Sequence, residues 1–135
     1  LNTAARELRK VTPNLNVFPC FIWSGVEGLS DLLPQDEIEN GLHASLAETS
    51  LMLAIKPEIV GAERPFEGFS QKIPEGWSLE GDSPTAWMTN DLSKSGVIGD
   101  SRGANEKLGN DLRKLLVKHW YKLFLSLMSS DWPNE

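Results

Sequence analysis

The chain has few of the residues from which metal and redox sites are most often built. It holds one cysteine, Cys20, and only two histidines among 135 residues. A single cysteine excludes an internal disulfide and a zinc site made of several cysteines. Cys20 lies in the apolar run of residues 17–23. Because free cysteines are usually buried, we expect Cys20 to be a small buried hydrophobe rather than a nucleophile.

An excess of basic charge and long apolar runs are also absent from the sequence. The net charge of −6 argues against a general binder of nucleic acid or anionic membranes, since such proteins present a basic face. No apolar run reaches the ~18 residues that a membrane-spanning helix needs, and no secretory signal pattern is present. We therefore expect a cytoplasmic protein that has neither nucleic-acid nor membrane partners. Its length and hydrophobic content of 40% suit one domain with a core.

Helical periodicity and helix breakers predict three main helices. Residues 3–10 form the first, which ends before Pro13 because the residue preceding a proline avoids the helical region. The second covers residues 45–56 and ends at Pro57. The third begins after Asn105 and continues to about residue 128, with leucines recurring every three or four positions. A short helix is expected at residues 36–39.

Strand signals are sparse by comparison. Residues 16–23 are predicted to form a buried strand, although Pro19 argues against a central position in a sheet. Residues 86–88 are predicted to form a short strand, and residues 61–86 otherwise form a long loop. Alternating strands and helices favour an α/β layer architecture. The few predicted strands would form only part of such a sheet. We therefore expect a partner or a missing segment to supply the remaining strands.

The most informative stretch covers residues 43–53, where His43 and Glu48 lie at the start of a predicted helix. Polar groups at such loop-to-helix junctions often carry the chemistry of α/β enzymes. A second interpretation of His43 is a loop histidine with local hydrogen bonds. For Glu48 the second interpretation is structural, because the pattern Ser45-x-x-Glu48 predicts a capping box. Trp77 and Trp87 could line a substrate pocket, although a core or interface position is more common for tryptophan.

Three segments resemble, in order and spacing, the C-terminal half of the creatininase (creatinine amidohydrolase) family. The central one resembles the family's H-A-G-x-x-E-T-S signature, with Ser45 in the place of its glycine. The acidic residue that the family often carries just before this histidine is absent, because Asn40, Gly41 and Leu42 occupy those positions. The three segments cover nearly the whole chain and are residues 3–9, residues 43–53 with 57–60, and residues 95–100 with 104–109.

This resemblance implies a partial three-layer α/β/α fold with few strands and a long C-terminal helix. It implies hydrolysis of small, sometimes cyclic, amide C–N bonds at a site with two divalent ions, zinc or manganese, that activate a bridging water. In that family His43 corresponds to a residue that exchanges protons with the leaving nitrogen, and Glu48 is a further candidate. The metal ligands, including the histidine of an N-G-H-G-G-N segment, would precede Leu1. Residues 1–135 are then one domain that lacks its metal-ligand half.

Two functional hypotheses follow, and they predict different behaviour toward metal. In the first, the chain is half of a metal-dependent amidohydrolase, inactive when isolated and active with the missing half. In the second, it is a non-catalytic truncated homologue that serves as an oligomerisation or structural module. A third hypothesis, a partner surface formed by residues 61–86, rests on their aromatic content. In each case we expect an oligomer rather than a monomer, because unpaired strand edges and apolar faces drive association.

Overall fold

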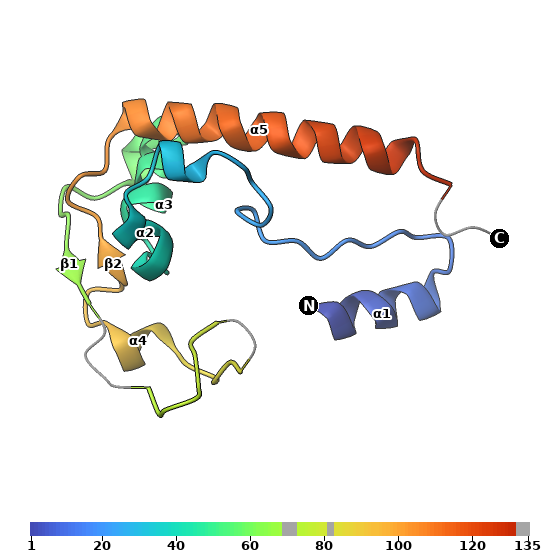
Figure 1. Cartoon of the computed structure of the whole chain (residues 1–135), viewed down its shortest axis with the longest axis horizontal. Helices are drawn as coiled ribbons and strands as arrows, with labels where there is room; N and C mark the ends of the chain where they lie inside the picture. Colours follow the sequence, from blue (N-terminus) through green and yellow to red (C-terminus); the bar gives the residue numbers. More distant parts are fainter. Residues whose placement is uncertain (69–72, 81–82, 132–135) are drawn as a thin grey trace.

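The computed structural model describes residues 1–68, 73–80 and 83–131, and Figure 1 shows the course of the chain. Short 3-10 turns at Leu29–Asp31 and Pro57–Ile59 connect some of the elements. The helices and strands, in chain order, are α1 (Asn2–Val11), α2 (Gln35–Asn40), α3 (Leu46–Ile55), β1 (Phe66–Glu67), α4 (Thr89–Leu92), β2 (Gly99–Asp100) and α5 (Glu106–Met128).

All four helices expected from the sequence are present. The first is α1, the short helix is α2, the helix after Ser45 is α3 and the long terminal helix is α5. Asn105 caps α5 as predicted, since its Oδ1 accepts the N–H of Leu108 at 2.9 Å. Loop residues 61–86, as far as the structure describes them, contain the short strand β1 that the sequence pattern did not predict, because two residues are too few to show a period.

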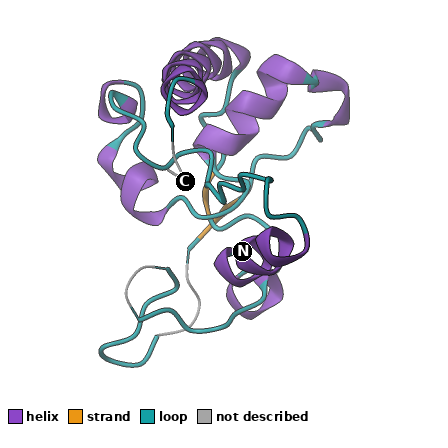
Figure 2. Ribbon diagram, turned by 90° about the vertical axis from the view of Figure 1, so that its right-hand side faces the viewer, coloured by secondary structure: helices purple, strands orange, loops and turns teal. Residues whose placement is uncertain are grey.

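The main core lies where α3 crosses the N-terminal half of α5. Figure 2, which looks nearly along α5, shows the two helices side by side. Leu33, Ala47 and Leu112 form the buried cluster between them. Gly109 allows the close approach, because a Cβ atom there would collide with the backbone carbonyl of Ser50. Ser50 is itself fully buried, and its hydroxyl accepts the N–H of Asn105 at 3.1 Å, so α3 also fixes where α5 begins.

A small antiparallel sheet joins three distant segments beside this core. β1 pairs with β2, with Phe66 opposite Asp100, and the sheet continues through a bridge between His43 and Ile98. The guanidinium group of Arg102 reinforces the pairing, because it bonds to Asp100 at 2.8 Å and lies 4.6 Å from the centre of the Phe66 ring. The backbone of His43, two residues before the predicted helix start, is thereby tied to Ile98.

The prediction of a strand at residues 16–23 is wrong for this structure. The segment lies extended below the C-terminal half of α5 (Figure 1), but within the described part of the chain no strand pairs with it. A strand exists only with a partner for its backbone groups, so an apolar pattern alone does not create one. Cys20 is exposed rather than buried for the same reason. Residues 86–88 are also not a strand, since they run as a connection into α4.

Among the helices of the described residues, none is both long enough and apolar enough to cross a bilayer.

Candidate functional site

The structure brings His43 and Glu48 together at the entrance to α3. The Nδ1 atom of His43 lies 3.8 Å from Oε2 of Glu48, and the two side chains are 53% and 41% exposed. His43 is fixed by its backbone, because its N–H bonds to the carbonyl of Ile98 at 3.2 Å and its carbonyl accepts the N–H of Ile98 at 2.8 Å. The imidazole therefore projects from a paired segment into a solvent-accessible position.

Glu48 does not form the predicted capping box. Its carboxylate accepts the N–H of Ala44 at 2.7 Å, not that of Ser45. Ala44 has a φ of 48°, a left-handed conformation that is unusual for a residue with a side chain. The hydroxyl of Thr49 donates to the carbonyl of Ala44 at 2.8 Å, so both polar groups of this residue are bonded to α3. The strained turn is held in place and sets the direction of the preceding His43.

Ser45 is almost fully buried and serves as a junction rather than as a cap. Its hydroxyl donates to Oε2 of Glu37 at 2.5 Å and accepts the N–H of Asp100 at 2.9 Å. The other oxygen of Glu37, Oε1, accepts the N–H of Ala47 at 2.7 Å. The carboxylate from α2 therefore takes the place of the cap at the start of α3, where a negative charge is favourable. One buried carboxylate links α2, α3 and, through Ser45, β2.

Gly99 permits this junction because there is no room for a side chain beside Ser45. Its φ of 130° is in the region that glycine favours, and a Cβ atom there would lie 2.8 Å from Cβ of Ser45. The roles of Glu37, Ser45 and Gly99 in forming the site were not predicted from the sequence. One feature pointed to them: Ser45 replaces the glycine of the family signature, and a buried hydroxyl at that position needs an acceptor nearby.

A shallow hollow of about 320 Å³ opens next to Glu48. Its wall is formed by one face of α3 and by the 3-10 turn that follows it. It is mainly apolar with a polar end at Glu48, which suits a small molecule with one polar group. Its lining residues are Ala44, Glu48, Thr49, Met52, Ile59, Val60 and Gly61.

The two tryptophans predicted to bind substrate lie elsewhere. Trp87 packs against the second core cluster of Leu79, Leu92 and Ile98, and its Nε1–H donates to the carbonyl of Leu79 at 3.0 Å. Trp77 is largely exposed. Neither lines the hollow beside Glu48. A substrate-binding role for either tryptophan stays a prediction, and Trp87 has a structural role in the core.

Glu67 holds the loop that leads to Ile98, the residue that bridges to His43. Its carboxylate accepts hydrogen bonds from the hydroxyl of Ser95 at 2.6 Å, the N–H of Lys94 at 2.8 Å, the N–H of Ser95 and the hydroxyl of Ser93. These bonds, that of the Ser95 hydroxyl first, lower the pKa of Glu67 from 4.5 to about 2. The ionised carboxylate is therefore the form on which the loop depends.

This shift predicts an acid-sensitive loop. Because the pKa of Glu67 is lower in the folded chain, its stabilising effect is complete above about pH 4.5 and disappears as the pH falls to about 2. Glu67→Gln should lower the free energy of unfolding at pH 7 and flatten its decline between pH 5 and pH 2.

Urea unfolding at several pH values measures how the free energy of unfolding depends on pH in the two proteins. Glu58→Gln is the control, and an equal decline in wild type and Glu67→Gln would contradict the prediction. Asp100, whose pKa Arg102 lowers to about 2, accounts for part of the decline that remains.

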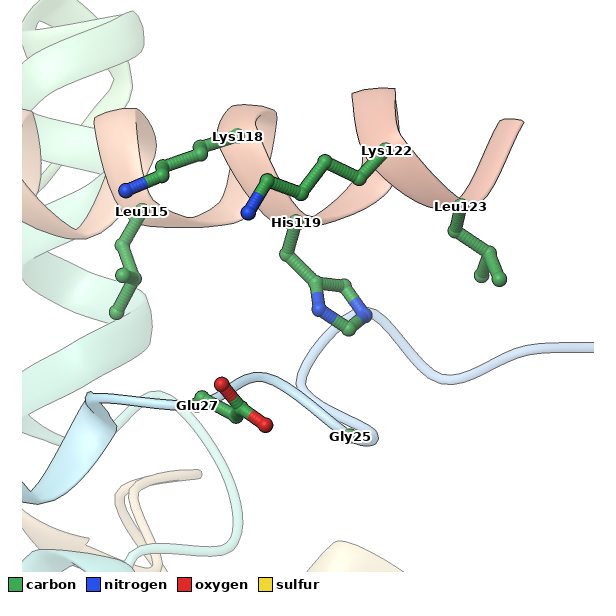
Figure 3. A pocket seen from close by; sticks show the side chains of 7 residues that line it. All are labelled: Gly25, Glu27, Leu115, Lys118, His119, Lys122 and Leu123. Carbon is green, nitrogen blue, oxygen red and sulfur yellow. The ribbon is translucent and has the colours of Figure 1, made fainter. Parts of the chain in front are cut away.

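A second and larger hollow, of about 420 Å³, lies between α5 and the loop at residues 25–27 (Figure 3). His119 and two lysines of α5 line one side, and Glu27 faces them from the loop. The ring of His119 packs edge-on against Trp120. This hollow shares no lining residue with the one beside Glu48.

Comparison with known families decides the assignment. The sequence model of the creatininase family, described as creatinine amidohydrolase, matches residues 1–124. The chain belongs to the creatininase family. Among curated proteins, none matches it. The resemblance seen in the three sequence segments is thus confirmed.

Two solved structures show the creatininase fold of this chain. One is a protein from Bacteroides fragilis NCTC 9343 that carries the assignment creatinine amidohydrolase, with 21% identity and a TM-score of 0.74. The other is a mutant creatininase complexed with creatine, with 20% identity and a TM-score of 0.60. Each similarity covers 96% of this chain but 50% of the other. The chain therefore spans about half the length of these creatininase-like proteins and shares their fold over that half.

The creatininase assignment raises the question of where divalent metal could bind. Among residues 1–68, 73–80 and 83–131, no group of three or more histidine, cysteine, aspartate or glutamate side chains is arranged to hold a metal ion. His43, in the loop before α3, and Glu48, in the first turn of α3, are two possible ligands 3.8 Å apart. The described residues thus do not fit a two-metal centre.

Proposed function

We propose that this chain supplies the proton-transfer part of a creatininase-type amidohydrolase site. The reaction is hydrolysis of an amide C–N bond, in a cyclic or linear small molecule. The observation that carries the proposal is the pairing of His43 with Glu48 at the edge of the hollow on α3. Amide hydrolysis needs a group that donates a proton to the leaving nitrogen, and an accessible imidazole is the most common such group in enzymes.

The surroundings of His43 support a directed role rather than a loose loop. The Glu48 carboxylate is anchored by the N–H of Ala44, so its negative charge stays beside the ring that becomes positive when it accepts a proton. The bonds of His43 to Ile98 fix the position of its backbone. Glu37 and Ser45 hold the next turn from the buried side. Substrate would enter from the hollow beside Glu48, with its leaving nitrogen toward His43.

The proposal also covers what lies outside this chain. The zinc or manganese ions of a creatininase-type site would be held by donor groups from the other half of the domain, or from another subunit of a homo-oligomer. The 50% coverage of both solved structures supports this arrangement. The isolated chain would then bind little metal and be inactive. For the experiments below, the complementary half is defined as the part of the Bacteroides fragilis relative that this chain does not match.

A second candidate function is a non-catalytic assembly module of the same family. Its support is the large number of exposed apolar side chains, among them Phe21, Phe124 and Met128. Such a chain would keep the fold and bind partners without turning over substrate. The two candidates differ in what happens when the fold is completed.

An activity assay of wild type and His43→Gln separates the two candidates. The chain is assayed on creatinine and on small linear amides, with zinc or manganese, alone and with saturating complementary half. We expect turnover only in the complex, and His43→Gln should lower kcat by about 10²–10⁴, because a general acid–base group contributes that much. His119→Gln is the matched control and should keep the wild-type kcat.

Each other outcome has a definite meaning. A formed complex without turnover would favour the assembly module. Equal activity of His43→Gln and wild type would remove His43 from the mechanism. Turnover by the chain alone would show that it holds its own metal site, contrary to the proposal.

A further inference from the structure

Residues 15–23 have the composition of a strand and lack the partner of one. Their backbone makes few bonds within the described chain, since no N–H of residues 16–23 donates to another described backbone group. The segment is nevertheless held at its end: the Nε1–H of Trp120 donates to the carbonyl of Ile22 at 2.9 Å, and Trp23 packs on the main core. It is thus an extended segment, fixed in position, with free hydrogen-bonding groups along its edge.

The side chains of this segment are apolar and face solvent. Phe18 and Ile22 are exposed, and Phe21 is 55% exposed. Polar residues are expected on a solvent-facing strand of a soluble domain, so this pattern indicates a segment designed to be covered on both faces. Pro19 interrupts the N–H donors of one edge only, because successive residues of a strand point their backbone groups to opposite edges. The edge of Asn16, Phe18 and Cys20 keeps all its N–H donors, and within the described chain the carbonyl of Phe18 accepts only the thiol of Cys20, at 3.1 Å.

The C-terminal half of α5 continues the same exposed surface. It extends past α3 and lies above residues 12–24 (Figure 1). Its exposed apolar residues are Tyr121, Leu123, Phe124, Leu125 and Met128. The hollow of Figure 3 separates it from the loop below. We define the seam as residues 15–23 together with α5 from Tyr121 to Met128.

The hollow in the seam is better explained as a gap to be filled by protein than as a ligand site. Lys118 and Lys122 lie at its rim and are exposed, while Leu115 and Leu123 form its walls. It lies beside the unpaired segment and shares Lys122 and Leu123 with the seam. An apolar wall with a charged rim, next to a free strand edge, is typical of a protein interface.

Two observations identify the polypeptide that covers the seam: the share of each solved structure that this chain matches, and the charges around the hollow. The two solved structures form the same fold from chains twice as long, so their remaining half must cover surfaces that are bare here. A second copy of this chain is less suitable. In a twofold interface two identical seams would face each other. The lysines Lys118 and Lys122 of both copies would then share one interface, with Glu27 the one acidic residue that lines the hollow. A different polypeptide can present acidic groups instead.

We propose that the seam binds the complementary half of the creatininase domain, which adds a β-strand along residues 16–20 and covers the exposed face of α5. This inference rests on the proposed function in that it names the partner of the same domain. It extends that proposal by assigning the pairing edge and the α5 residues. The occupant is a polypeptide with a strand edge and an apolar layer bordered by acidic groups.

The experiment mixes the 135-residue chain with the complementary half, and measures mass by sedimentation velocity and amide exchange by mass spectrometry. As a positive control, the complementary half is refolded with the other half of the Bacteroides fragilis protein, to show that it is competent to bind. We expect a 1:1 complex and at least 100-fold slower exchange of the amides of Asn16, Phe18 and Cys20, which point to the proposed pairing edge. Phe18→Asp with Phe21→Asp should weaken binding at least 100-fold. Ile55→Asp, at a site that is also 55% exposed, is the matched control and should bind normally.

The outcomes separate this inference from the proposed function. Binding of the complementary half without amide hydrolysis by the complex would support the proposed seam and contradict the proposed enzymatic function. The proposed seam would be overturned if a competent complementary half formed no complex with the chain. It would also be overturned if Ile55→Asp weakened binding as much as the Phe18→Asp and Phe21→Asp pair. A defined dimer of this chain that protects the amides of Asn16, Phe18 and Cys20 without the other half would identify a second copy as the occupant and overturn the proposal. Unchanged helical circular dichroism of the Asp variants shows that they remain folded.

Discussion

Gly109→Ala is expected to lower the free energy of unfolding by about 3 kcal/mol, the upper part of the usual range for overpacking a tight contact. The added Cβ atom would collide with the carbonyl of Ser50 and lie 2.9 Å from Cβ of Ala54. Backbone cannot rotate away as a flexible side chain can, so α3 and α5 must separate. The main core between them would open, and the 43–48 junction at the start of α3 would lose its support.

Urea or thermal unfolding followed by circular dichroism measures this effect. Gly61→Ala is the matched control, because the same Cβ atom meets nothing within 4 Å there. That variant should be neutral or slightly more stable, since alanine restricts the unfolded chain. Similar stability of Gly109→Ala and Gly61→Ala would show that the α3–α5 contact is looser than described.

Glu37→Ala is expected to destabilise the chain by about 2–4 kcal/mol. It removes the acceptor of two donors, the hydroxyl of Ser45 and the N–H of Ala47, in a buried place where water cannot replace it. Each buried donor left unpaired costs about 1–3 kcal/mol. Unlike a general loss of stability, this change should act first on the junction that carries His43.

Amide exchange at Ala44, Ala47 and Asp100 measures the local effect. Glu37→Ala should speed exchange there more than in the centre of α5. Glu37→Gln keeps one oxygen acceptor and should have a smaller effect, and Glu39→Ala, on the exposed side of α2, should have almost none. Uniform acceleration throughout the chain would show that Glu37 stabilises the fold without a special role at the junction.

The helices could be predicted from the sequence, whereas the way the junction is held could not. Periodicity, Pro13, Pro57 and Asn105 define α1, α3 and α5, because these signals act within a few residues. The capping box was the natural prediction for Ser45 and Glu48. It fails because a carboxylate eight positions earlier, Glu37, competes for the Ser45 hydroxyl. Such a contact depends on how α2 packs, which no local pattern encodes.

The strand prediction shows a different limit. The pattern of residues 16–23 expresses a preference for pairing and burial, but the outcome depends on a partner strand. Without that partner in the described chain, Cys20 and Phe21 are exposed, contrary to the sequence-based expectation for Cys20. The preference nevertheless locates the seam. The segment whose predicted strand is missing is therefore the same segment that is proposed to pair with the complementary half.

The candidate site was predicted in part. The sequence placed His43 and Glu48 together, and the structure puts them 3.8 Å apart. The structure does not place Trp77 or Trp87 beside these two residues, since Trp87 completes a core cluster and Trp77 faces solvent. His43 and Glu48 are only five positions apart, on either side of the start of α3, so a local pattern suffices to bring them together. Residues from distant loops depend on tertiary packing.

Metal content tests the central claim most directly, namely that this chain is a creatininase half-site completed from outside. Mass spectrometry of elements is applied to protein purified without chelator and dialysed, alone and in complex with the complementary half. The account predicts less than stoichiometric zinc or manganese in the chain alone and about two ions per complex, as in a two-metal hydrolase. About two ions retained by the chain alone, or a complex that retains none, would contradict it.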